Sequence, residues 1–132
     1  MSENILEKII KNKIKKIDIL KKSISLDSLK DRINENKSFI NFKEKIENNI
    51  KNDKISIIAE IKKASPSSGL IIEDYNPVNI AEIYKSNNAT CLSVLTEEDF
   101  FLGNLIHISK IKQQINLPIL CKDFFVDKFQ VH

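Results

Sequence analysis

Hydrophobic residues in the N-terminal part of the chain recur at steps of three and four, the period of a helix that buries one face. The stripe that predicts this helix consists of Leu6, Ile9, Ile10, Ile14, Ile17, Leu20 and Ile24. Asn4 and Glu7 have the spacing of a capping box, which indicates where the helix starts. Two shorter helices are predicted after it, one from about Leu26 to the early thirties and one from Asn41 to about Asn48.

The pattern changes after Asp53. The run ISIIAEI (residues 55–61) is short, β-branched and almost continuously apolar, which is typical of a parallel strand covered on both faces. The elements predicted after it are a helix opened by Asn76 and Pro77, a strand at 90–96, a helix at 104–115 and a strand at 117–124. Alternation of strand and helix implies an α/β fold with a parallel sheet and right-handed crossovers.

Charged residues stand at the carboxyl ends of the first and third predicted strands. Side chains alternate along a strand, so Glu60 and Lys62 share one side of the first, and Lys122 and Phe124 share one side of the third. The carboxyl ends of parallel strands form the ligand-binding rim of such folds, so these residues predict a site. The alternative is a solvent-exposed ion pair between Glu60 and Lys62, which would contribute little to stability.

Composition fits one small domain that has no membrane span. The chain has 132 residues and a mass of 15.2 kDa, and 42% of its residues are hydrophobic, enough for a core. No run approaches the roughly 18 apolar residues of a membrane helix, and the N-terminus lacks a signal-peptide pattern, so we expect a cytoplasmic protein. Cys91 and Cys121 lie inside apolar runs, which favours buried free thiols over a disulfide or a metal site.

The basic charge is concentrated before residue 55. Residues 1–54 carry a net charge of +5 and residues 55–132 a net charge of −2. The stretch KNKIKKIDILKK could contact nucleic acid or an anionic membrane, but it lacks aromatic residues and its isoleucines have helical spacing. We therefore interpret its lysines as the solvated face of a helix and expect neither a nucleic-acid nor a membrane partner.

Three stretches together resemble one enzyme family. EIKKASPS, LSVLTEEDFF and LCKDF, in this order, are similar to the first βα units of indole-3-glycerol-phosphate synthases, tryptophan-biosynthesis lyases with a TIM-barrel fold. The resemblance covers nearly the whole chain, including the N-terminal helices. It implies a helical extension at 1–54, followed at 55–132 by the first three strands and two helices of a (β/α)8 barrel.

The resemblance also implies an activity and the residues that perform it. The family's reaction is the decarboxylating ring closure of 1-(2-carboxyphenylamino)-1-deoxyribulose 5-phosphate to indole-3-glycerol phosphate, carbon dioxide and water. By resemblance, Lys122 is the general acid of ring closure, Lys62 binds the substrate carboxylate and Glu60 is its carboxylate partner. The substrate-binding residues implied are Ser65 near the phosphate, and Phe101 and Phe124 against the anthranilate ring. Neither a metal nor another cofactor is implied.

Several other polar residues match no catalytic position of the family. We interpret His107 and His132 as surface or helix-packing residues. Glu97, Glu98 and Asp99 form an acidic cluster after the second strand, and we expect a solvated loop there rather than a metal site.

The length of the chain leaves two functional hypotheses. A complete barrel needs about 250 residues, so the chain is expected to be an incomplete barrel that is inactive by itself. The first hypothesis is a lyase that needs the missing C-terminal part, and the second is a non-catalytic polypeptide that folds by self-association or with a complementary chain. Phosphoribosylanthranilate isomerase, another barrel of the same pathway, is disfavoured because EIKKASPS and LCKDF point elsewhere.

Overall fold

A computed structural model of the protein describes residues 4–35 and 38–132, and the chain divides into two compact units. One unit comprises Met1–Phe39 and Phe124–His132, and the other comprises Ile40–Asp123. The boundary expected after residue 54 rests on the change of sequence pattern and stays a prediction.

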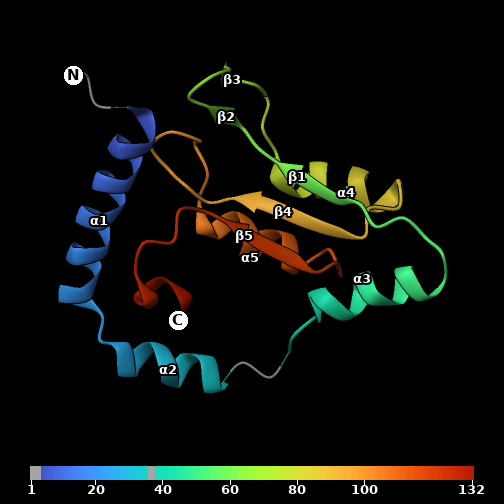
Figure 1. The fold of residues 1–132 in the computed structure, drawn as a ribbon, viewed down its shortest axis with the longest axis horizontal. Helices are drawn as coiled ribbons and strands as arrows, with labels where there is room; N and C mark the ends of the chain where they lie inside the picture. Colours follow the sequence, from blue (N-terminus) through green and yellow to red (C-terminus); the bar gives the residue numbers. More distant parts are fainter. Residues whose placement is uncertain (1–3, 36–37) are drawn as a thin grey trace. The chain divides into compact units, whose positions relative to one another are not determined.

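The first unit consists of α1 (Ile5–Ser23), α2 (Leu26–Glu35) and a 3-10 helix, η1 (Lys128–Val131) (Figure 1). The predicted capping box is confirmed. The Asn4 side chain accepts the Glu7 N–H at 2.9 Å, and the Glu7 carboxylate accepts the Asn4 N–H at 3.3 Å. An ion pair between Lys21 and Asp127 joins α1 to the start of η1, and the hydrogen bond from Lys21 lowers the pKa of Asp127.

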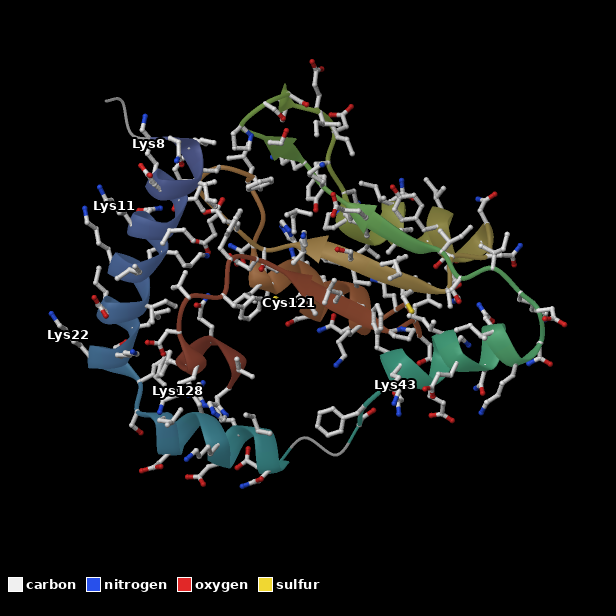
Figure 2. The ribbon with its side chains drawn as sticks, in the orientation of Figure 1. Lys8, Lys11, Lys22, Lys43, Cys121 and Lys128 are labelled. Atoms are coloured by element: carbon white, nitrogen blue, oxygen red, sulfur yellow. The ribbon has the colours of Figure 1, made fainter. Side chains whose placement is uncertain are left out.

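The two sides of α1 differ only in part as the sequence pattern predicts. Ile9 and Ile17 of the apolar stripe are buried, whereas Leu6, Ile14 and Leu20 of the same stripe are exposed. Figure 2 shows Lys8, Lys11 and Lys22 extending from one side of the same helix, and all three are exposed to solvent. The basic stretch is therefore the polar face of an amphipathic helix. None of the helices in the described part of the chain is long and apolar enough to cross a membrane.

The second unit contains the sheet. Its elements in chain order are α3 (Phe42–Lys51), β1 (Ile58–Ile61), β2 (Ala64–Ser65), β3 (Gly69–Leu70), α4 (Pro77–Ser86), β4 (Cys91–Leu95), α5 (Leu105–Lys112) and β5 (Ile119–Lys122). The three longer strands form a parallel sheet in the order β1-β4-β5, and β2 and β3 form a small antiparallel hairpin. Helices α4 and α5 lie on one face of the parallel sheet (Figure 1). The predicted α/β class and strand-helix alternation are confirmed.

The core of this unit lies between the sheet and the helices α4 and α5. Its buried members are Ile61, Ala81, Leu92, Val94, Ile111, Ile115 and Leu117. Alternate residues of the edge strands point to the other face, where Ile58 is 47% and Leu120 is 46% exposed. The sequence prediction that the first strand is covered on both faces is therefore wrong. Its apolar run reads as doubly buried because a β-branched strand has the same pattern whether or not its second face is covered.

The strands are shorter than the apolar runs that predict them. β1 begins at Ile58 because the backbone of Ile57 is bound by Thr90, whose hydroxyl accepts the Ile57 N–H and whose N–H donates to the Ile57 carbonyl, both at 2.9 Å. The Asn49 side chain of α3 donates to the hydroxyl groups of Thr90 and Ser56, at 3.2 and 3.1 Å. A side-chain oxygen thus takes the place of a backbone acceptor for the Ile57 N–H, while the Ile57 carbonyl still accepts backbone N–H groups.

Candidate functional site

The carboxyl end of β1 carries the first two predicted site residues. Glu60 lies in the strand and Lys62 directly follows its last residue, so both project to the face away from α4 and α5. The Lys62 ammonium lies 3.2 Å from the Glu60 carboxylate, and the two side chains are 35% and 38% exposed. The expected ion pair is present, in a half-exposed setting where such a pair contributes little to stability.

Lys122, the last residue of β5, lies at the same end of the sheet. Glu60 pairs with Ser93 and Ser93 with Leu120, so the face that carries Glu60 also carries Leu120 and, two residues on, Lys122. The structure therefore brings Glu60, Lys62 and Lys122 to one face at the carboxyl ends of two strands. A carboxylate and two ammonium groups there can bind an anionic ligand and exchange protons with it.

Ser65 has a local structural partner. It is 8% exposed, and its hydroxyl accepts the Ser68 N–H at 3.2 Å and lies 3.3 Å from the Ser67 hydroxyl. These contacts close the hairpin of β2 and β3, which the sequence did not predict. Gly69 completes the turn at φ +63°, a conformation that side chains disfavour. Binding of a phosphate by Ser65 stays a prediction.

Phe101 lies in the loop between β4 and α5, and a buried carboxylate holds this loop. Glu97 is 1% exposed, and its side chain accepts the N–H groups of Asp99, Phe100 and Phe101 at 3.2, 2.7 and 3.1 Å. The expectation that this acidic cluster is a solvated loop is therefore wrong for Glu97. A glutamate two residues after a buried strand can fold back onto the following N–H groups, and this local signal could have indicated its role.

Gly103 closes the same loop. Its N–H donates to the Glu97 carbonyl at 2.7 Å. A β-carbon at this position would lie 2.3 Å from the carbonyl oxygen of Leu95, so no residue with a side chain fits without movement of the backbone. Glycine thus lets the loop return closely over the end of β4.

The ends of β4 and β5 are joined by a second polar residue that the sequence did not single out. Thr96 is 2% exposed, and its hydroxyl donates to the Asp123 carboxylate at 2.8 Å and lies 3.4 Å from the Cys121 sulfur. Cys91 is buried, as predicted, whereas Cys121, on β5 in Figure 2, is only half-buried, so the predicted burial is wrong for this residue.

Phe124 belongs to the other compact unit, where its carbonyl oxygen accepts a hydrogen bond from the Gln130 side chain at 2.9 Å. Its expected place beside an aromatic ring of the substrate stays a prediction.

His107 packs against Tyr75, with ring centroids 5.4 Å apart, and the helix-packing interpretation is confirmed.

Comparison with known proteins decides the family. The family model described as indole-3-glycerol phosphate synthase matches residues 6–132. The chain belongs to the indole-3-glycerol phosphate synthase family. An indole-3-glycerol phosphate synthase of Clostridium acetobutylicum is 46% identical over 129 residues, which are 97% of this chain and 48% of that protein.

Other relatives give the same result. One from Trichodesmium erythraeum is 39% identical over 130 residues, covering 98% of this chain and 43% of the relative. The tryptophan biosynthesis protein TrpCF of Buchnera aphidicola is 44% identical over 133 aligned positions, covering 100% of this chain and 28% of the relative. The chain thus spans less than half the length of these relatives, and it combines N-terminal helices with an unclosed parallel sheet that forms part of a TIM barrel.

Proposed function

We propose that this chain carries the N-terminal part of the active site of an indole-3-glycerol-phosphate synthase. The reaction would be the decarboxylating ring closure of 1-(2-carboxyphenylamino)-1-deoxyribulose 5-phosphate. The observation that carries the proposal is the grouping of Glu60, Lys62 and Lys122 on one face at the carboxyl ends of β1 and β5, in a chain of this family.

The three residues have distinct roles in this proposal. Lys122 acts as general acid and protonates the substrate's carbonyl oxygen as the aryl carbon attacks, so that the oxygen becomes a hydroxyl. Lys62 binds the substrate carboxylate, which leaves as carbon dioxide, and then donates a proton when the hydroxyl departs as water. The ring proton lost in this dehydration would be taken up by a base from the part of the relatives that this chain does not span. Glu60 holds the Lys62 ammonium in place through the contact at 3.2 Å.

The loops at this edge would bind the rest of the substrate. Phe101 would contact the anthranilate ring from the loop held by Glu97, and Phe124 would supply a second aromatic contact. Ser65, the last residue of β2, follows β1 by four residues and would lie near the phosphate. The remainder of the barrel would enclose the substrate, so we expect catalysis to require residues from the part of the relatives that this chain does not span.

The proposal also includes the cellular compartment in which the chain acts. The substrate carries a phosphate and a carboxylate, and charges of this kind do not cross a bilayer unaided. We therefore expect the chain to act in the cytoplasm.

A mixing experiment tests the proposal. The purified chain is combined with the C-terminal portion of the Clostridium acetobutylicum relative, and formation of indole-glycerol phosphate is followed by its fluorescence. We expect activity only in the mixture and a loss of at least about 100-fold with Lys122→Ala, since general acid catalysis contributes factors of that order. Lys85→Ala, at the far end of α4, is the control and should retain activity.

Two results would contradict the proposal. Equal activity of the Lys122→Ala mixture and the unchanged mixture would remove Lys122 from the reaction. A stable complex without activity would favour the second hypothesis, a non-catalytic polypeptide that associates with a complementary chain.

A further inference from the structure

A cleft of about 980 Å³ lies in the second unit, between the N-terminal ends of α4 and α5. Its lining includes Lys63, Tyr75, Asn76, Asn104, His107 and Lys110. Tyr75 packs against the core between the sheet and the helices, so the cleft lies on the helix side of the sheet. Glu60, Lys62 and Lys122 project to the other face, and the cleft is therefore separate from the proposed catalytic residues.

Two ammonium groups belong to one cluster in this cleft. The Lys63 ammonium lies 5.8 Å from the centroid of the Tyr75 ring, which packs on His107. Lys110 follows His107 by one helical turn on α5. Burial lowers the pKa of His107, and the charges of Lys110 and Lys63 lower it further, so the imidazole is neutral at pH 7. Among the residues that the structure describes, no carboxylate forms an ion pair with either lysine, although Glu82 also lines the cleft.

Two asparagines add hydrogen-bond donors. The side-chain oxygen of Asn76 accepts the N–H groups of Val78 and Asn79 at 3.1 Å, and that of Asn104 accepts the Ile106 N–H at 2.9 Å. Because both oxygens are used as helix caps, the NH2 end of each side chain remains available to a ligand. The caps also occupy helix N–H groups, so recognition would come from side chains, supported by the positive ends of the helix dipoles.

Two polar atoms of the cluster have no partner. The Tyr75 hydroxyl and the Nδ1 atom of His107 are buried and make no hydrogen bond to any residue that the structure describes. Buried polar atoms are rarely left unpaired, and each such case points to a water, an ion or a ligand group. Both atoms belong to residues that line the cleft.

We propose that this cleft binds a small phosphate ester, with the phosphate between Lys63 and Lys110 and the NH2 groups of Asn76 and Asn104 as further donors. Two uncompensated ammonium groups match a dianion better than a single carboxylate. The volume leaves room for a short polyol, whose hydroxyl groups would donate to the Glu82 carboxylate. The proposal needs no catalytic residue, so it can fail while the lyase proposal holds, and the reverse is also true.

Nuclear magnetic resonance on the whole chain tests this site, with inorganic phosphate and glycerol 3-phosphate as probes and sodium chloride as the control at equal ionic strength. We expect saturable shifts at Tyr75, Asn76, Asn104 and His107, and a rise in the pKa of His107, because a bound anion favours the imidazolium. The double variant Lys63→Gln with Lys110→Gln should weaken binding at least tenfold. Lys112→Ala, an exposed lysine of α5 outside the cleft, should leave it unchanged.

Several outcomes would overturn the proposal. Shifts spread over the lysines of α1 without saturation would indicate unspecific screening. Unchanged binding by the double variant would place the anion elsewhere. No shift at His107 would mean that water alone satisfies the unpaired atoms. Glutamine keeps most of each lysine stem, and circular dichroism of the variants checks that the fold is retained.

Discussion

The pair formed by Glu60 and Lys62 has more consequence for chemistry than for stability. Both side chains are more than one-third exposed, and exposed pairs contribute about 0 to 1 kcal/mol. Without the carboxylate, however, the ammonium loses the contact that holds it toward the face of the sheet. A change at Glu60 should therefore affect the rate of catalysis and hardly affect the free energy of unfolding.

Glu60→Gln should therefore separate the two effects. We expect the mixture with the C-terminal portion of the relative to lose activity by about 10- to 100-fold, as typical for a misplaced catalytic group. The urea midpoint of the chain should hardly move. Glu73→Gln, an exposed glutamate outside the sheet, is the control for both measurements. An equal loss of activity in the control would contradict the assigned role.

Tyr75 makes stability depend on alkaline pH. Burial raises the pKa of Tyr75 to about 12, whereas the unfolded chain has the ordinary value near 10. Up to about pH 10 both states keep the proton. Above it the unfolded state loses the proton first, so the stability is lost as the pH rises toward 12.

Denaturant unfolding between pH 9 and pH 11.5 measures this effect. We expect the free energy of unfolding to fall over this range, and the fall to be smaller in Tyr75→Phe, which has no titrating hydroxyl. Tyr84→Phe is the matched control for Tyr75→Phe. It also removes a tyrosine hydroxyl, but one that has a hydrogen-bond partner, the Glu60 carbonyl. The same slope in Tyr75→Phe and in the unchanged chain would show that other groups cause the pH dependence.

At the scale of elements, the loop between β4 and α5 depends on one buried side chain. Glu97 accepts three N–H groups, and Gly103 permits the close return of the chain to β4. Glu97→Ala leaves these donors unpaired, which costs about 1 to 3 kcal/mol for each donor that water cannot reach. The urea midpoint should fall clearly in Glu97→Ala and little in Glu98→Gln, a change at the exposed neighbour.

Proteolysis gives a second readout for the loop. Cleavage near Phe100 and Phe101 should become faster in Glu97→Ala, because local opening exposes this segment. Cleavage that is faster throughout the chain would instead indicate global destabilisation and would contradict a local role.

The helices and strands themselves were largely predictable. Asn4, Asn41, Asn76 and Asn104 each cap a helix, and this short-range chemistry is visible in the sequence. The first residue of β1 was not predictable, because Thr90 binds the backbone of Ile57 from a position far along the chain. The burial of Glu97 was also missed, since its charge suggested that the side chain is exposed to solvent.

At the scale of the whole molecule, the sheet leaves one face partly uncovered. Ile58 and Leu120 lie on the edge strands β1 and β5 and are nearly half exposed. In a closed barrel this face lines the interior, where layers of side chains fill the space. The proposed C-terminal portion would therefore bury these residues.

Leu120→Asn tests this burial. The change should have little effect on the stability of the chain alone, because the side chain is already exposed. It should weaken association with the C-terminal portion of the Clostridium relative by at least tenfold, measured by calorimetry, because a buried leucine contributes about 1.5 to 3 kcal/mol. Leu105→Asn, an exposed leucine of α5, is the control. Unchanged association would mean that this face is not where the two portions meet.

The sequence by itself determined the helices, the strand-helix alternation and the family, because periodicity, caps and motifs are properties of neighbouring residues. It also determined which residues share a face at the ends of β1 and β5, because side chains alternate along any strand. Only the tertiary structure decided which sheet face stays open, that Glu97 is buried, and that Lys63, Tyr75, His107 and Lys110 line one cleft. These features depend on contacts between distant segments, and such contacts are set by packing rather than by local pattern.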